Sequence, residues 1–462
     1  MSNMKELDEE EHIIKNVPVI YKDELGKDPP SKKKYLYYGL IIAGIVILIA
    51  IVIIIIVALN KSPTAEINKT NTLKAKYYTD GDEISVKLFS YTIKNSYISS
   101  MKIDNKNIED IDNIYTFNLA GEHSLELKLN QSLETMEEMF SECLFLTEVD
   151  LSDIKTEEVK DMSKMFYKCE SLKSINFANM NTPALLNMTN MFNGCFSLTS
   201  IDLRNFDTSK VVNMNNMFNS CYKVISINLN NLDASNVIDM SNMFSSCIAL
   251  TDLNIKNFKT NKVINMSKMF FRCYSLKTLD ISSFRTSQVT TMEGMFHFCT
   301  DLSELNLRNL DTSKVKDMSN MFAACRSIGS IDLSNFNTKQ VQNMNNMFNG
   351  CFFLQNIYLN HFITDNLKQM SMMFYGCLSV SSLDLSKLNT KNVQNMGGLF
   401  GRCISLENID IRNFDTSGLI SISNLFSEIS DNGTIYYNSH LFNETLFNYD
   451  SLKYWKKIDI SK

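Results

Sequence analysis

The chain has 462 residues, a length that fits roughly two to four domains. Its 45 basic and 51 acidic residues nearly cancel, and the net charge of −6 argues against a nucleic-acid-binding protein, which would carry a strongly basic stripe. The chain has 26 Met and 11 Cys but only 5 His and 1 Trp, so few residues are available for a His-based catalytic or metal site. Eleven Cys are too few over this length for a disulfide-dense scaffold, and their number is odd.

The first segment, residues 1–34, is charged and contains Pro18, Pro29 and Pro30, so we expect a disordered tail. Residues 9–14 are similar to an acidic di-leucine sorting signal with Ile in place of Leu, although they also fit a solvated acidic run. The charges that flank the next segment predict that this tail is cytoplasmic.

Residues 35–59 form a run of 25 residues without a charge, and a membrane span needs about 20 apolar residues. A cleaved signal peptide would have an apolar core of about 7–15 residues near the start of the chain, and this run is longer and begins later. Lysines fill positions 32–34, whereas only Lys61 lies close on the other side of the run. The positive-inside rule therefore predicts an uncleaved signal anchor, a single transmembrane helix with its N-terminus in the cytoplasm.

The predicted anchor sets the location of the rest of the chain. Residues 60–72 are expected to be a linker, and everything after residue 60 would lie outside the cell or in an organelle lumen. Within the span, Gly39 and Ala43 have the spacing of a small-xxx-small pair, which would permit weak self-association.

Residues 73–130 are expected to form a small β-rich module close to the membrane, because their apolar residues alternate. The alternating runs are Ile84-Val86-Leu88, Met101-Ile103, Tyr115-Phe117-Leu119 and Leu125-Leu127-Leu129. Gly81 and Gly121 separate some of these runs, as expected of turns.

Residues 131–430 carry an internal repeat whose period is fixed by cysteine. The eleven cysteines are Cys143, Cys169, Cys195, Cys221, Cys247, Cys273, Cys299, Cys325, Cys351, Cys377 and Cys403, each 26 residues after the last. A Phe stands three residues before every Cys and recurs in phase at Phe426, where Ile429 replaces the Cys. Met has the same phase, and 21 of the 26 Met lie in two columns, seven and four residues before Cys. The sequence thus contains about twelve units, the last of them degraded.

Each unit is predicted to be a strand and then a helix. In the unit from Cys195 to Cys221, Ile201 and Leu203 alternate around Asp202, as in a short strand. Residues 207–209, Asp-Thr-Ser, are typical of a helix N-cap, and apolar residues from Val211 onward recur at steps that fit one face of a helix. We therefore expect an α/β solenoid of about twelve coils that bury a continuous core only when stacked.

The spacing of Leu198, Ile201 and Leu203 resembles the L-x-x-L-x-L core of leucine-rich repeats. The fuller unit, with M-F-x-x-C and then L-D-L-x-x-F-D-T-S, is similar to the BspA-like branch of that superfamily and to repeats of bacterial, mycoplasmal and protist surface proteins. The Asn or Cys column of the leucine-rich-repeat consensus falls here on Phe or Leu, as at Phe206 and Leu232, so we expect packing rather than an Asn ladder to hold the turn. The resemblance implies a surface protein of adhesion or recognition, without catalytic residues or a cofactor.

The Met and Cys columns are expected to be core. Met fills irregular gaps, and a free Cys behaves as a small buried hydrophobe. Disulfides between neighbouring coils remain an alternative, since stacked Cys would lie about 5 Å apart, within the range of a disulfide. Metal binding is disfavoured because no C-x-x-C spacing occurs.

The column seven residues after Cys is predicted to point outward from a concave sheet. It holds Asp150, Asn176, Asp202, Asn228, Asn254, Asp280, Asn306, Asp332, Tyr358, Asp384 and Asp410. The column fits either a solvated hydrogen-bonded ladder or a strip for cations such as Ca²⁺, which takes oxygen ligands.

One unit breaks that pattern with Tyr358, His361 and Ile363, and aromatic residues of this kind are enriched in contact hot spots, although drift is an alternative. A further column carries Arg204, Arg308 and Arg412, which would rim a binding face or pair with the Asp residues. The candidate binding face comprises Asp202, Asp280, Asp332, Tyr358, His361, Ile363, Asp384, Asp410, Arg308 and Arg412.

Residues 431–462 are expected to cap the open end of the solenoid, with a last strand at 434–437 and Trp455 in the cap core. Sequons for N-glycosylation stand at Asn68, Asn130, Asn187, Asn265, Asn432 and Asn443. They matter only if the chain passes through a eukaryotic secretory pathway.

Together these features predict a single-pass protein of the plasma membrane whose non-catalytic ectodomain binds proteins or glycans on another cell or matrix. One alternative is an endocytic or signalling receptor that is sorted by its cytoplasmic tail, and another is a purely structural coat. A degradative ectoenzyme is disfavoured because His123, His297, His361 and His440 are scattered along the sequence.

Overall fold

A computed structural model describes residues 69–447 and 450–461, which belong to one compact unit. The predicted tail at 1–34, the predicted span at 35–59 and most of the linker, with Asn68, lie outside the described residues. In the part of the chain that the structure describes, no helix combines the length and the apolar composition needed to cross a bilayer.

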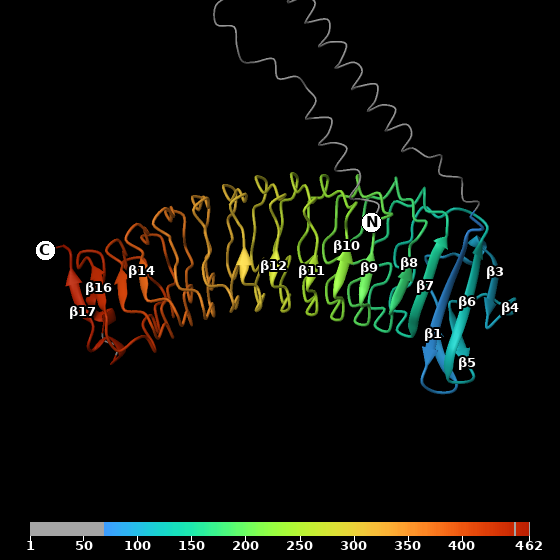
Figure 1. Cartoon of the computed structure of the whole chain (residues 1–462), viewed down its shortest axis with the longest axis horizontal. Helices are drawn as coiled ribbons and strands as arrows, with labels where there is room; N and C mark the ends of the chain where they lie inside the picture. Colours follow the sequence, from blue (N-terminus) through green and yellow to red (C-terminus); the bar gives the residue numbers. More distant parts are fainter. Residues whose placement is uncertain (1–68, 448–449, 462) are drawn as a thin grey trace, which may run out of the picture. The chain divides into compact units, whose positions relative to one another are not determined.

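The described unit is a β-solenoid, a stack of similar coils joined to a small β module (Figure 1). The N-terminal module contains β1 (Thr72–Thr79), β2 (Ile84–Lys87), η1 (Asn95–Tyr97), β3 (Ile98–Ile103), β4 (Lys106–Ile108), β5 (Ile114–Phe117) and β6 (Gly121–Leu129). The coils contribute β7 (Leu146–Asp153), β8 (Ser174–Asn176), β9 (Ser200–Asp202), β10 (Ser226–Asn228), β11 (Asp252–Leu253), β12 (Thr278–Leu279), β13 (Glu304–Leu305), β14 (Ser382–Asp384) and β15 (Asn408–Asp410). The C-terminal segment adds β16 (Thr434–Tyr437), η2 (Glu444–Phe447), η3 (Asp450–Leu452) and β17 (Lys456–Asp459).

The N-terminal module is continuous with the solenoid. One sheet has the strand order β4-β3-β6-β1-β7-β8, in which β1 pairs antiparallel with both β6 and β7, and β7 pairs parallel with β8. The alternating runs of the sequence correctly predict strands in this module, but β1 was not expected. Because β1 alternates Lys with buried Leu73, Ala75 and Tyr77, it covers the open end of the first coil.

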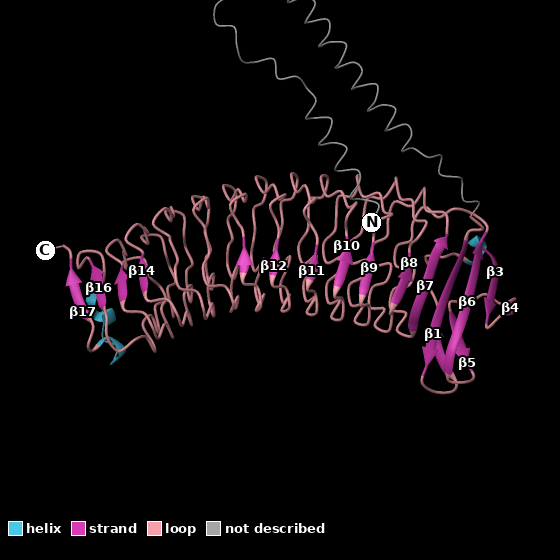
Figure 2. Ribbon diagram, viewed as in Figure 1, coloured by secondary structure: helices cyan, strands magenta, loops and turns pink. Residues whose placement is uncertain are grey.

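The predicted α/β class is wrong in its helical part, since the described residues contain short 3-10 turns but no α-helix (Figure 2). In the segment from Met214 to Cys221, Asn216 and Ser220 have left-handed φ angles of 53° and 61°, which a helix cannot accommodate. The N–H groups of Met214, Asn216, Phe218 and Ser220 donate to carbonyls of the next coil, at 2.8–3.2 Å, instead of to their own turn. The segment is therefore a chain of tight turns that pairs with its neighbours as a strand does.

The core is built from columns that repeat from coil to coil. Twelve Phe side chains, from Phe140 to Phe426, stack with ring centroids between 5.5 and 6.1 Å apart and nearly parallel planes. The two Met columns are buried, as predicted. All eleven Cys are free and buried, and from Cys169 onward each thiol donates to the carbonyl of the Phe 29 residues earlier, at 2.9–3.3 Å. Burial raises the pKa of these thiols, for example to about 12 at Cys247.

The Thr of the predicted N-cap motif joins neighbouring coils. Thr312 is fully buried, and its hydroxyl donates to the carbonyl of Asn337 at 3.0 Å and accepts from the N–H of the same residue at 2.8 Å. Equivalent pairs recur along the stack, for example at Thr208 and Thr338, whereas Ala234 interrupts the column. This motif therefore links coils and does not begin a helix.

The C-terminal segment closes the other end of the stack. β16 is a strand where the sequence predicts one, and it pairs parallel with β15 and with β17. Trp455 is 4% exposed, as expected of cap core, and its indole N–H donates to the carbonyl of Ser430 at 2.8 Å.

Candidate functional site

The Asp/Asn column lies along the strands, which occupy a broad side of the stack in Figure 1, and we call this side the strand face. Each Asp or Asn of the column accepts a hydrogen bond from the backbone N–H two residues later, at 2.9–3.3 Å. These contacts are Asx turns, which shape the chain as it leaves the strand. One oxygen of each side chain is therefore committed to the fold.

The remaining oxygens of several Asp residues meet arginine. Arg204 and Arg412 pair with the Asp two residues before them, Asp202 and Asp410, whereas Arg308 reaches Asp332 on the next coil at 2.8 Å. The hydrogen bonds from Ser334, together with Arg308, lower the pKa of Asp332 to about 2. The arginines of the strand face thus pair with its carboxylates.

The Tyr358 coil (residues 351–376) departs from this arrangement. Tyr358 is 71% exposed and Ile363 is 46% exposed, and both stand where other coils carry an Asx residue that accepts a backbone N–H. Neither side chain can accept that bond. The coil consequently exposes an aromatic and an apolar side chain where the neighbouring coils carry Asp or Asn side chains that accept a backbone N–H.

His361 has a structural explanation. Its Nε2 donates to the carbonyl of Leu333 at 2.9 Å, which matches the bond from Asn335 to Leu307 one coil earlier. The Asn residues of this column form an inter-coil ladder, contrary to the prediction that packing rather than an Asn ladder holds the turn. The ladder was missed because these Asn residues stand one position before the consensus position, which holds Phe or Leu. Their recurrence every 26 residues, as at Asn179, Asn205 and Asn335, was the available signal.

The structure brings part of the predicted face together. Arg308, Asp332, Tyr358, Asp384 and Asp410 occupy five consecutive coils, and β14 pairs with β15 directly between the last two. Asp202 lies at β9, beside β10, and Asp280 comes just after β12, where it faces Lys256 at 3.9 Å, so both are farther along the stack.

The described sequons differ in their accessibility. Asn130, Asn432 and Asn443 are exposed, whereas Asn187 and Asn265 are half-buried in turns between coils. The Asn187 side chain donates to Asp161 at 3.1 Å and accepts from the N–H of Thr189 at 3.1 Å, so its amide already serves the fold.

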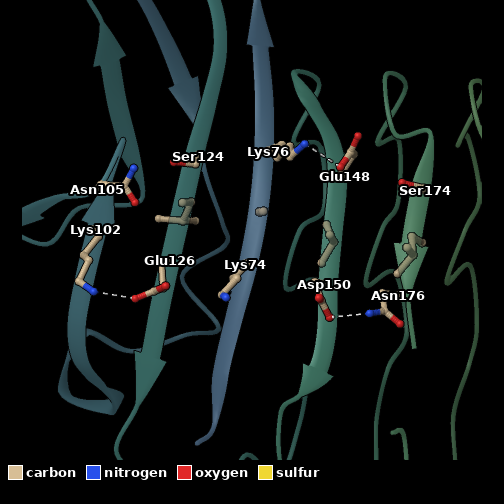
Figure 3. A pocket seen from close by; sticks show the side chains of 14 residues that line it. Lys74, Lys76, Lys102, Asn105, Ser124, Glu126, Glu148, Asp150, Ser174 and Asn176 are labelled. Carbon is tan, nitrogen blue, oxygen red and sulfur yellow. Dashed lines mark hydrogen bonds and ion pairs between the residues drawn. The ribbon is translucent and has the colours of Figure 1, made fainter. Parts of the chain in front are cut away.

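A hollow on the sheet shared by the module and the solenoid has mixed charge (Figure 3). Lys76 pairs with Glu148 at 3.2 Å and Lys102 with Glu126 at 2.8 Å, while Asn176 donates to Asp150 at 3.0 Å. These groups satisfy one another, and Lys74 also lines the hollow without an ion pair among the described residues. The hollow therefore offers a ligand a single cation and no set of unpaired charges.

Sequence reasoning missed a second surface, which we call the Cys-turn edge, formed by the residues from five before to two after each Cys. Its outward positions carry Phe196, Tyr222, Phe352, Phe353 and Ile404. Of these, Phe353 is 63% exposed and Ile404 is 57% exposed. A column of aromatic and apolar residues directly after Cys was the signal in the sequence.

Among the described residues, no group of three or more His, Cys, Asp or Glu side chains is placed to hold a metal ion.

The comparisons with known proteins bear on the family to which the chain belongs. No curated protein matches the chain. The model of the family described as "Mycoplasma protein of unknown function, DUF285" matches it repeatedly, over residues 87–200, 134–253, 186–303, 220–331, 248–358 and 325–440. Because these overlapping matches run without a gap from 87 to 440, well over half of the 462 residues, the chain belongs to the DUF285 family.

Proposed function

We propose that the protein is a non-catalytic recognition protein of the cell surface, which displays its solenoid on a membrane anchor formed by residues 35–59. The solenoid binds proteins or glycans of another cell or matrix through side chains that vary over a repeated core. The resemblance of the repeat to BspA-like surface proteins supports this role, as does the uninterrupted apolar run of the anchor.

The observation that carries the proposal is the exposed pair Tyr358 and Ile363. A side chain that replaces a backbone-capping carboxylate sacrifices a local hydrogen bond, worth about 0.5–1.5 kcal/mol, and adds exposed apolar area. Tyr is enriched at binding hot spots because it offers a large, stiff contact surface with a polar end. The charged pair of Arg308 and Asp332 on the preceding coils supplies a polar rim beside Tyr358.

The test restores the repeat consensus. Beads coated with the full chain are assayed for attachment to a panel of matrix proteins and of glycan-bearing cells. We expect Tyr358→Asp and Ile363→Asn to reduce attachment at least tenfold while thermal stability stays equal or rises, because both variants regain an Asx bond. Asn254→Asp, four coils away in the same column and outside the candidate face, keeps its Asx bond, serves as the matched control and should attach normally. Unchanged attachment by Tyr358→Asp would contradict the proposed site.

Surface display is tested separately by protease treatment of intact cells that express the chain. We expect the residues after 60 to be digested while the segment before 35 survives. Protection of the solenoid in intact cells would place the protein on an internal membrane instead.

A further inference from the structure

The Cys-turn edge contains a trough that spans several coils. In the column one residue before Cys, Ala324, Gly350 and Gly376 stand in successive coils, and the bulky Phe298 and Arg402 stand at the two ends. The hollow between these ends has a volume of about 540 Å³. Small residues in three successive coils therefore leave a channel parallel to the axis of the stack.

The trough results from side-chain size and not from an altered backbone. Gly350 and Gly376 have φ angles of 71° and 70°, and Ser220, Phe298 and Arg402 adopt the same left-handed region in the same column, with φ angles of 58–63°. A Cβ atom at Gly350 would lie 3.7 Å from Ala324 and 3.8 Å from the ring of Phe352, an ordinary contact distance. Larger side chains thus fit this column, and their absence keeps the trough open.

The walls carry aromatic rings, amides and positive charge. Phe352 and Tyr375 line the trough together with Asn320 and Asn346, and no Asp or Glu is among the residues that line it. Arg326 lies over the Phe352 ring, 5.1 Å from its centroid, and pairs with no carboxylate among the described residues.

One end of the trough adds to this positive charge, whereas the arginine at the other end is paired with a carboxylate. Arg272 lies 5.9 Å from the centroid of Phe298 at one end, and Arg402, which pairs with Glu428 at 3.2 Å, stands at the other. Beside them, burial together with Arg272 and Lys268 lowers the pKa of His297 to about 4, so this ring is neutral near pH 7.

The backbone of the trough is already paired. The N–H groups of Ala324, Gly350 and Gly376 donate to carbonyls of the next coil at 2.6–2.8 Å. A peptide that binds by adding a strand needs an unpaired edge, which these residues do not offer. Recognition must therefore use the ring faces, the amides and the guanidinium groups of the walls.

We propose that this trough binds a carboxylated glycan, an inference that rests on the proposed function and specifies its ligand class and a second contact surface. Sugar rings would lie against Phe352 and Tyr375, and Arg326 would pair with carboxylates, which guanidinium groups bind in a bidentate manner. The amide of Asn320 would exchange hydrogen bonds with hydroxyls, and the amide of Asn346, whose Oδ1 already accepts from Asn349 at 2.9 Å, would donate to them.

The test measures binding of hyaluronan oligosaccharides, whose uronates carry carboxylates, to the purified full chain at two salt concentrations. Dextran supplies a neutral glycan and polyglutamate an acidic peptide. We expect salt-sensitive binding of hyaluronan, no binding of dextran and weaker binding of polyglutamate. Gly350→Phe, which fills the trough with the side chain present at Phe298, and Arg326→Gln should each weaken hyaluronan binding at least tenfold.

Ser220→Phe places the same ring in the same column outside the trough and should leave binding unchanged. Arg326→Gln alters an exposed side chain, so it remains informative if Gly350→Phe misfolds. Absence of hyaluronan binding, binding that neither variant weakens, or tighter binding of polyglutamate would each overturn the inference. If attachment still depends on Tyr358 in any of these cases, the proposed function survives and only the trough assignment fails.

Discussion

The buried Thr column makes a quantitative prediction about what holds the coils together. In Thr312→Val the side-chain shape is kept, but the hydroxyl that satisfies both the N–H and the carbonyl of Asn337 is lost. Each buried polar group left without a partner costs about 1–3 kcal/mol, and partial access of water to Asn337 lowers this, so we expect a loss of about 2–4 kcal/mol in total. Thr312→Ser keeps both bonds and removes one methyl group, which should cost only about 1 kcal/mol.

The assay combines thermal unfolding of the chain with hydrogen exchange at the amide of Asn337, because a repeat protein can open locally without global unfolding. We expect faster exchange in Thr312→Val than in Thr312→Ser. The reverse order would show that the column acts by packing, and the reasoning would be refuted. Ala234→Thr, which completes the column where the chain itself lacks the hydroxyl, should instead slow exchange at Lys259.

Three further predictions concern the core and its titration. Phe296→Ala, which removes a fully buried ring stacked between two others, should cost about 3–5 kcal/mol in thermal unfolding. His297 is kept neutral in the fold with its pKa lowered to about 4, so stability should fall as pH drops from about 6.5 toward 4, and His297→Asn should flatten that profile. Because the Cys thiols are buried with raised pKa values, the folded chain should resist iodoacetamide, and its intact mass should be the same with and without reductant; rapid modification of the folded chain would contradict this.

The core was predictable from sequence because its evidence is periodic. A Cys every 26 residues with Phe and Met in fixed phase specifies a repeated buried column whatever the backbone does between them. The strands were predictable from the alternation around Asp202. The helix predicted in each unit was wrong because apolar residues spaced three and four apart fit successive tight turns as well as they fit a helix. The distinguishing signal lies in two columns. The column of Asn216 holds Asn or Gly in most units, and the column of Ser220 holds Gly in several, and both residue types favour positive φ.

The candidate site was harder to predict for a different reason. The outward direction of the Asp/Asn column results from alternation, but alternation does not reveal that each carboxylate accepts its own backbone N–H. The recurrent Asp-x-Ser spacing, as at Asp280 and Asp384, is the local sign of an Asx turn. The trough was invisible to periodic reasoning because the same column holds small residues elsewhere, as at Gly194 and Ser220. What sets the trough apart is the set of neighbouring side chains, with Phe352 and Tyr375 on its walls, and these become apparent only when adjacent coils are aligned.

The stacked phenylalanines imply a simple rule for how this protein can change in size. Neighbouring coils contact each other through the same Phe rings, Cys thiols and backbone groups along the stack, with 5.5–6.1 Å between Phe ring centroids. Duplication or loss of one whole unit, such as residues 222–247, would therefore lengthen or shorten the rod by about one such step without creating a new type of contact. Insertion of half a unit would break every column at once. The reach of the solenoid is consequently adjustable in discrete increments, while its two capped ends remain unchanged.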